Sequence, residues 1–401
     1  MYKRQTIAYS GLQAANTSLT ITGHNVSNIN TKGYTKQQAG TQAADALRTH
    51  TTYGAIGSGV VVTEISQIRD SYYDVKYRNN MANYGQYSVK ESYMGQIEDY
   101  LDEFTLNGYS QEYKNFFSAV NQLTITPGDT SAKNQLINNA KSLADYFNTL
   151  TTNLRNVQAD ANNEIKDAVQ QINSYAKNIA ALNRQINQIE ANYGNANDLR
   201  DKRNAMIDEL SEIVNLETSE EDMGNNVSNF LVRINGQTLV SSYSYNTLET
   251  VARTDKKNYS DAEGLYDVQW NSGQKFDMYS TSLSGHLKGL IDIRDGNNGE
   301  HENIETDDDG NNVTDSDGNL VLTTAPAADK TVSYKGVPYY QAQLNEFAKI
   351  FSDAVNKIMK SGYTSDGSSK GISLFVTQPN TTVMSAGNIT VNPEPVSYTH
   401  L

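Results

Sequence analysis

The sequence predicts an α+β multidomain protein. Its expected form is an elongated bundle of long coiled-coil helices with a small antiparallel β domain and an N-terminal assembly helix. Three observations predict this. Residues 129–193 lack glycine and proline, and their apolar residues recur at alternating spacings of four and three. The same spacing occurs over residues 8–29, whereas a period of two begins after residue 217.

The N-terminal segment, residues 1–68, is predicted to be an assembly segment that begins with a helix over about residues 6–28. The seam of this helix is Ala8, Leu12, Ala15, Leu19, Thr22, Val26 and Ile29. Burying one Leu or Val is worth roughly 1.5–3 kcal/mol, so a stripe of this kind needs a partner. Residues 40–66 are predicted to be extended and loop-like, with one strand at Val60–Ile65.

Residues 69–216 and 282–362 are predicted to form a helical rod. Its longest helix has a seam from Leu136 to Tyr193, and one irregular step between Ala161 and Ile165 predicts local unwinding of the supercoil. That helix is expected to pack on the helices at 69–104, 198–216 and 341–358. We interpret the tyrosines of the first of these, including Tyr73, Tyr77 and Tyr84, as a packing surface. The last helix has the seam Leu344, Phe347, Phe351, Val355 and Ile358.

Residues 217–281 are predicted to be the small β domain. Phe230, Val232 and Ile234 alternate with polar residues before an Asn-Gly hairpin turn at 235–236. A second hairpin is expected over Tyr266–Met278. An acidic hairpin insertion, residues 296–337, interrupts the rod, and residues 363–401 are expected to begin a C-terminal region.

The composition excludes several classes of function. The 401-residue chain has a net charge of −14, so its field repels phosphate backbones and predicts no nucleic-acid partner. It has no cysteine, which excludes disulfides and thiolate chemistry. It has no apolar stretch of the ~18 residues that a membrane-spanning helix needs, so we expect no membrane insertion. Residues 1–30 lack the apolar core of an ordinary secretory signal.

We find no constellation that supports catalysis. His301 and Glu302 resemble half of a zinc-protease motif, but Glu305 stands where a second histidine is required. The two Asp-x-Asp-Gly-Asn runs at 307–311 and 315–319 are better explained as hairpin turns, although calcium binding there stays open. We therefore expect no enzymatic activity, no catalytic residue, no cofactor and no metal site.

Two N-terminal motifs carry a resemblance. Residues 10–15 read Ser-Gly-Leu-Gln-Ala-Ala, and residues 25–34 read Asn-Val-Ser-Asn-Ile-Asn-Thr-Lys-Gly-Tyr. This pair resembles the N-terminal signature of flagellar rod, hook and hook-associated proteins. Later motifs resemble the hook-associated proteins of the hook-filament junction, the FlgK family. They are Gly57–Val60, Phe116–Ser118, Ala196–Arg203, Gly285–Leu290 and Arg294-Asp295.

The resemblance implies a structural subunit that joins hook to filament by self-assembly and is needed for flagellum assembly and motility. Its implied partners are identical subunits, the hook protein, a second junction protein next to the filament, and the flagellar export apparatus with its chaperone. It implies an extracellular location reached without a cleaved signal peptide. Family members end in a long C-terminal helix that pairs with the N-terminal one, so we expect this chain to be C-terminally truncated and to lack the chaperone site.

The expected assembly interface combines the N-terminal seam with the signature. It consists of Leu12, Ala15, Leu19, Val26, Asn28, Ile29, Asn30, Gly33 and Tyr34. Two alternatives remain open at this stage. One is another flagellar axial protein of the hook or rod type, and the other is an unrelated elongated surface coiled-coil adhesin.

Overall fold

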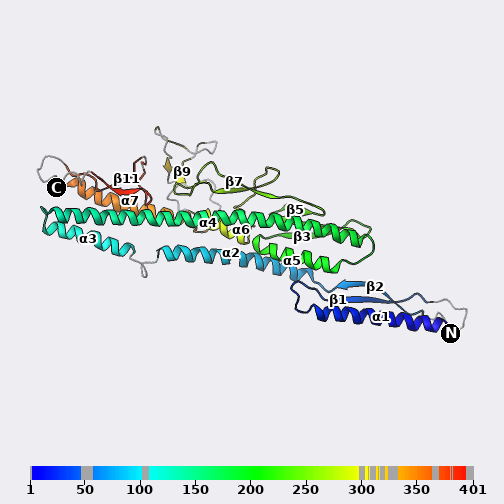
Figure 1. The fold of residues 1–401 in the computed structure, drawn as a ribbon. Coiled ribbons are helices and arrows are strands. Elements are labelled where there is room, and N and C mark those ends of the chain that lie inside the picture. Colours follow the sequence, from blue (N-terminus) through cyan, green and yellow to red (C-terminus); the bar gives the residue numbers. More distant parts are fainter. Residues whose placement is uncertain are drawn as a thin grey trace.

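The molecule is elongated, and one long helix runs through most of its length (Figure 1). A computed structural model describes it, and the N-terminus lies at one end, where a helix and two strands extend beyond the rod. The α+β fold class predicted from the sequence is confirmed. The described residues are 2–46, 57–101, 108–297, 303–305, 307, 313–314, 316, 321–323, 333–363, 370–379, 381 and 383–393.

The long helix α4, Thr130–Glu190, is the axis of the rod. Asp129 caps its start by accepting a hydrogen bond of 2.8 Å from the Ser131 backbone N–H. The predicted seam is buried from Leu136 to Ile186, apart from half-buried Tyr175 and Leu182. The prediction is wrong at the end of the seam, where the side chains of Ile189 and Tyr193 are exposed because the chain reverses there and the covering layer ends.

Four helices line the rod beside α4. They are α2 (Ser71–Leu101), α5 (Asn197–Ile213), α6 (His286–Arg294) and α7 (Val337–Ser361). The predicted packing of α4 on α2, α5 and α7 is confirmed. Helix α3, Tyr109–Ile125, also packs on α4. Strands β11 (Phe375–Thr377) and β12 (Ile389–Val391) join α3 and α7 in a second core around Phe116, Phe147 and Phe375.

The packing surface predicted for α2 is wrong. Its buried face includes Ala82, Gly85, Val89 and Ile97, whereas Tyr73, Tyr77 and Tyr84 are exposed. The remaining buried residues of α2 are Arg78, Lys90 and Tyr93. Gly85 explains why α2 packs on α5 with this face. A Cβ at this position would overlap the backbone carbonyl oxygen of Glu212, so α2 approaches α5 too closely for a larger side chain.

Gly85→Ala should destabilise the protein although alanine favours helices. The added Cβ forces α2 away from a backbone atom, and overpacking of this kind costs about 1–3 kcal/mol. Gly95→Ala is the matched control in the same helix, because a Cβ there meets nothing within 4 Å. The control should be neutral or gain up to about 1 kcal/mol. Urea unfolding measures both variants, and equal stability of the two would contradict the close approach.

The seam predicted for α7 is displaced. Its buried face includes the polar residues Gln341, Asn345, Ser352 and Asn356, whereas Phe347 and Ile358 are exposed. Hydrogen bonds explain the burial of the two asparagines. The Asn345 amide donates to Ser260 Oγ at 2.7 Å and accepts from the Ala386 N–H at 2.9 Å. Asn356 makes the corresponding pair of bonds with the Phe375 backbone.

The β domain contains a four-stranded antiparallel sheet in sequence order. The predicted hairpin turn at Asn235-Gly236 is confirmed, with both residues at positive φ. The second predicted hairpin is partly wrong, because its first strand, Tyr266–Trp270, pairs mainly with the earlier strand Leu248–Ala252. Beyond the predicted turn, a single bridge joins Gln269 to Lys275. The strands are β3 (Glu217–Asp222), β4 (Ser228–Ile234), β5 (Gln237–Ser241), β6 (Ser244–Tyr245), β7 (Leu248–Ala252) and β8 (Tyr266–Trp270).

In the acidic insertion, β9 (Asn303–Ile304) pairs antiparallel with β10 (Leu322–Thr323). Most of the two Asp-x-Asp-Gly-Asn runs, and His301 with Glu302, lie outside the described residues.

Candidate assembly interface

The N-terminal unit consists of helix α1 (Tyr2–Ser27) and the antiparallel strands β1 (Gln37–Ala43) and β2 (Val60–Gln67). The predicted helix is confirmed and begins four residues earlier than expected. Strand β1 lies partly in the segment predicted to be loop-like. Helix α1 lies along one side of the hairpin (Figure 1) and turns Ala14 and Ile21 toward it. The hairpin is therefore an in-chain partner that the sequence did not reveal.

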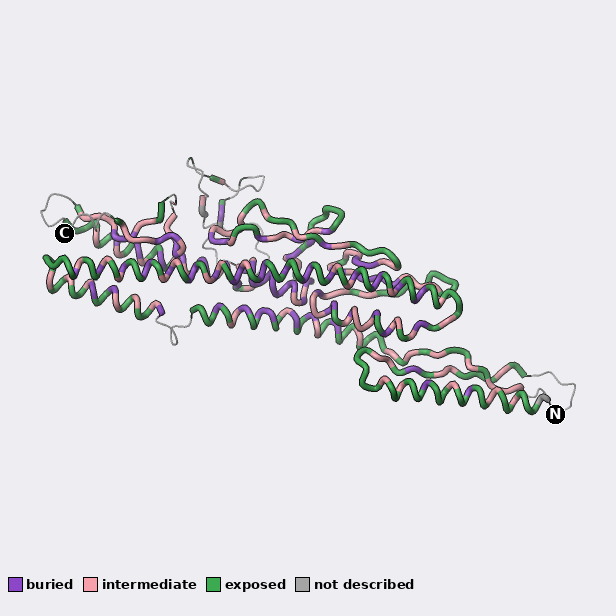
Figure 2. Tube along the Cα trace, in the orientation of Figure 1, coloured by how far each residue is buried: buried purple, intermediate pink, exposed green. Residues whose placement is uncertain are grey.

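The predicted apolar stripe lies on the opposite side of α1 from the hairpin. Leu12, Leu19, Val26 and Ile29 are 58% to 77% exposed, and Ala15 is exposed as well. Figure 2 colours most of α1 as exposed, whereas buried turns recur along α4. One face of α1 thus has a partner in the chain, and the described residues leave the stripe open to solvent.

The signature residues at the end of α1 form an intramolecular joint. Tyr34 donates a hydrogen bond of 2.7 Å to Asn25 Oδ1 and lies 3.0 Å from His24 Nδ1. Asn28 closes the helix end, where its amide donates to the His24 carbonyl oxygen. Gly33 has a φ of +81°, and a Cβ there would lie 3.0 Å from that of Ala205 in α5.

The same joint attaches the N-terminal unit to α5 through polar contacts. The Thr35 N–H donates to Asp201 Oδ2 at 2.9 Å, and the Gln37 amide donates to Asp198 Oδ1 at 3.0 Å. The Asn197 amide donates to the Ile65 carbonyl oxygen at 2.7 Å. Burial, followed by the nearby charges of Asp198 and Asp201, raises the pKa of the Tyr34 hydroxyl.

The structure therefore divides the predicted interface into two sets. Leu12, Ala15, Leu19, Val26 and Ile29 share the outward stripe, and Asn30 is exposed beyond it. In contrast, Asn28, Gly33 and Tyr34 belong to the joint. The motif at 196–203 and the N-terminal signature meet there, a contact that sequence reasoning missed because the two motifs lie far apart in the chain.

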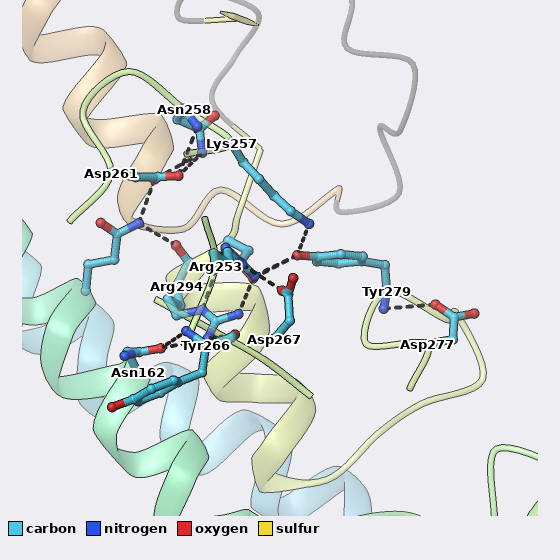
Figure 3. A network of polar contacts seen from close by, with 12 residues as sticks. Asn162, Arg253, Lys257, Asn258, Asp261, Tyr266, Asp267, Asp277, Tyr279 and Arg294 are labelled. Carbon is cyan, nitrogen blue, oxygen red and sulfur yellow. Dashed lines mark hydrogen bonds and ion pairs between the residues drawn. The ribbon is translucent and has the colours of Figure 1, made fainter. Parts of the chain in front are cut away.

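A network of charged side chains holds α6 to the β domain (Figure 3). Arg294 is fully buried, and its guanidinium donates to Asn162 Oδ1 on α4 and to the Tyr266 carbonyl oxygen, at 2.9 and 2.7 Å. Asp295 accepts two hydrogen bonds from Arg253, at 2.9 and 2.7 Å, and two from Arg294, at 3.1 and 2.5 Å. The carboxylate is thus the shared counter-charge of two buried arginines.

The pKa values in this network are strongly shifted. Burial alone would raise the pKa of Asp295, but Arg294 and Arg253 outweigh it and hold that pKa well below its ordinary value. Burial and the charge of Asp295 raise the pKa of Tyr279, and burial lowers that of Lys257, which contacts the Tyr279 hydroxyl. Such shifts also occur at catalytic sites. Here burial and the pairing of Asp295 with Arg253 and Arg294 explain the shifted pKa values, so the shifts do not require a catalytic role.

The described part of the chain also bears on metal binding and membrane insertion. Among the residues that the structure describes, no group of three or more His, Asp or Glu side chains is placed to hold a metal ion. In the same part of the chain, no helix combines the length and apolar character needed to cross a membrane.

Comparison with known proteins links this geometry to one family. Residues 94–375 match the family model of the flagellar hook-associated protein FlgK helical domain. The chain is 26% identical over 378 residues to flagellar hook-associated protein 1 of Bacillus subtilis, covering 91% of this chain and 68% of the relative. It is 30% identical over 370 residues to the protein of that name from Salmonella typhimurium, covering 86% and 65%.

A solved structure shares the fold. The flagellar hook junction protein FlgK from Burkholderia pseudomallei superposes with a TM-score of 0.56 at 23% identity, covering 75% of this chain and 46% of that one. The chain thus spans about two thirds of the length of these curated relatives and about half of the solved one.

Proposed function

The chain belongs to the FlgK family of flagellar hook-associated proteins, and from this membership we propose that it is a structural subunit that joins hook to filament. It acts by self-assembly and not by catalysis. The family match excludes the alternative of an unrelated surface adhesin. Support for the junction role comes from the names of the relatives and of the solved structure.

The observation that carries the assembly function is the outward stripe of α1. A helix that packs on its own hairpin with one face, and exposes Leu12, Leu19 and Val26 on the other with Ile29 exposed just beyond its end, has an apolar surface available for another subunit. We assign this role to residues 1–68, with the joint fixing their orientation on the rod. The helical rod and the β domain then form the outer part of each subunit.

The partners that follow from this role are identical subunits, the hook protein on one side and a second junction protein on the filament side. The subunit reaches this extracellular position through the flagellar export apparatus, without a cleaved signal peptide. In this proposal, assembly of the flagellum and motility depend on it.

Leu19→Asp should block assembly without unfolding the protein. The side chain is exposed in the isolated subunit, so a charge is tolerated there, but an assembled interface loses about 1.5–3 kcal/mol per buried leucine. Gln13→Glu is the matched control, because it adds the same charge at an exposed position of α1 that is not a helical neighbour of Leu12 or Leu19. Incorporation at the hook tip is measured by immunogold labelling of cells that lack their own family member.

We expect wild type and Gln13→Glu to be incorporated, and Leu19→Asp to be lost from the hook tip with unchanged circular dichroism. Incorporation of Leu19→Asp at the wild-type level would contradict the proposal that the stripe is the assembly surface.

A further inference from the structure

We propose that a row of amide side chains on α4 sets the register of the β domain along the rod. This set, called here the amide row, consists of Gln158, Asn162, Asn173, Asn183 and Asn187. Four of its members are no more than 5% exposed, and Asn173 is half-buried. The inference concerns how the chain fixes its own shape, so it goes beyond the proposed self-assembly and does not depend on it.

Two members of the amide row bind the backbone as a neighbouring strand would. The Asn173 amide donates to the Leu248 carbonyl oxygen and accepts from the Leu248 N–H, both at 2.8 Å. Asn187 makes the same pair of bonds with Ser228, at 2.7 and 3.0 Å. An exchange of both bonds with one residue is the pattern of an antiparallel strand pair. Since Leu248 begins β7 and Ser228 begins β4, each asparagine holds the start of one strand at a defined point of α4.

The other three members of the amide row also bind main-chain groups of the β domain. The pairs, with distances of 2.8, 2.8 and 3.0 Å, are Gln158 with Ala262, Asn162 with Tyr266, and Asn183 with Ser242. Figure 1 shows β5 and β7 lying along α4. The row extends over residues 158–187, about 44 Å of helix at 1.5 Å per residue, and therefore holds the β domain over most of this contact.

The apolar contacts of α4 alone leave the register open. Ile165, Ile172, Ile179 and Ile186 are fully buried and follow one another at intervals of seven residues. A neighbour displaced by seven residues, about 10.5 Å along the helix, therefore meets isoleucine again over most of the seam. Apolar contact is also non-directional. Burial of the seam thus distinguishes one register from another only weakly.

The amide row has no such repeat. Its members follow one another at spacings of 4, 11, 10 and 4, and a displacement by seven residues in either direction places no amide on the position of another. Such a displacement would leave the buried amides and their main-chain partners without these hydrogen bonds, which is costly although the apolar seam is still satisfied. A single buried asparagine selects the register of a coiled coil for the same reason.

Helix α7 makes the same kind of contact at the other end of the rod. The Asn356 amide accepts from the Phe375 N–H at 2.9 Å and donates to the Phe375 carbonyl oxygen at 2.8 Å. Phe375 begins β11 and belongs to the second core. The two-bond contact between a helix asparagine and the first residue of a strand therefore recurs in a separate part of the chain.

The register can be measured as a distance between spin labels, because the chain has no cysteine of its own. Asn156→Cys places one label on an exposed position of α4. The second label is at exposed Ser272→Cys, in the turn after β8, or at exposed Glu221→Cys on β3. The first pair reports on the β7–β8 sheet and the second on the four-stranded sheet. Double electron–electron resonance gives the distance distribution of each pair.

Asn173→Leu and Asn187→Leu are made singly and together in both labelled backgrounds. Leucine keeps about the volume of the side chain but makes no hydrogen bond. Asn178→Leu is the matched control, because it is the same change at an exposed position of the same helix. Circular dichroism and urea unfolding report folding and stability separately from the distances.

Wild type and Asn178→Leu should give one narrow distance for each label pair. In the double variant, both distributions should gain a second population displaced by one or two helical turns, about 5.4 or 10.8 Å. Each single variant should show a smaller second population in the sheet that its own asparagine holds.

Unchanged narrow distances in the double variant would overturn the proposal, because a fall in stability alone would mean that the amides contribute energy but do not select the register. If the double variant does not fold, the two single variants are judged by the same criterion. Loss of folding in both single variants would also overturn the proposal, since it requires the apolar seam to hold the β domain when one asparagine is missing.

Discussion

Asp295→Asn is expected to lower the free energy of unfolding by about 3–5 kcal/mol at neutral pH. Asp295 is the shared counter-charge of Arg253 and Arg294, with contacts of 2.7 and 2.5 Å. An amide keeps the shape of the side chain but leaves two buried guanidinium groups with less compensating charge. Arg253 retains an ion pair with Asp267 at 2.6 Å, whereas the guanidinium of Arg294 retains neutral acceptors, Asn162 and the Tyr266 carbonyl oxygen.

The difference between wild type and this variant should depend on pH. Because the pKa of Asp295 is held below its ordinary value, its contribution is fully present above the pKa of an unfolded aspartate, about 3.9. The contribution is lost as the pH falls from there toward the folded-state pKa. Asp261, whose pKa is raised chiefly by burial and further by the charge of Asp295, acts in the opposite direction, and the substitution removes the part of that shift that Asp295 causes.

The matched control is Asp267→Asn, which removes the other carboxylate that pairs with Arg253. The Asp267 side chain is 51% exposed, so its ion pair should contribute no more than about 1 kcal/mol. Urea unfolding of all three proteins at pH 7 and pH 3 measures the effects. Equal losses in both variants, or a loss in Asp295→Asn that grows toward pH 3, would show that the network does not rest on this charge.

Ile172→Ala is expected to lower the free energy of unfolding by about 2–5 kcal/mol, because Ile172 is fully buried between α4 and its neighbours and truncation leaves a cavity. Ile189→Ala is the matched control: it is the same change, in the same helix and on the same predicted seam. Ile189 is 41% exposed, so less apolar contact is lost and the effect should stay below about 1 kcal/mol.

Thermal and urea unfolding of the two alanine variants locate the end of the buried seam. A large effect at Ile189 would mean that the last turns of α4 are covered, as the sequence predicted. A small effect at Ile172 would mean that the α4 seam does not form the core of the rod.

The helices could be predicted because their seams are long and lack helix-breaking residues. The stretch from residue 129 to 193 predicts one helix whatever surrounds it, and its seam is correct as far as Ile186. The rotation of shorter helices about their axes depends on neighbours. Asn345 and Asn356 turn inward on α7 because backbone groups elsewhere in the chain complete their hydrogen bonds, and no local pattern signals those partners.

The α1 stripe could be predicted for the same reason, since its residues repeat at four and three. The joint could not. Strand β1 consists of Gln, Ala, Gly and Thr and has no alternation of apolar residues, and it forms by pairing with β2. Gly33 and Tyr34 gave a recognisable motif but no indication that Gly33 lies against Ala205 of α5. The charged network was equally hidden, because Arg253 and Asp295 are far apart in sequence.

The polar joint between the N-terminal unit and α5 also constrains the order of folding. The bonds from Thr35 to Asp201 and from Gln37 to Asp198 close loops of 166 and 161 residues. Contacts of such separation form late, because the entropy of closing the loop is lost before the contact compensates for it. The first segment of the chain to be synthesised is therefore among the last to dock. Its apolar stripe acquires a fixed direction relative to the rod only once the rod has folded, so under the proposed function a subunit can offer its assembly surface in the right orientation only after its rod has formed.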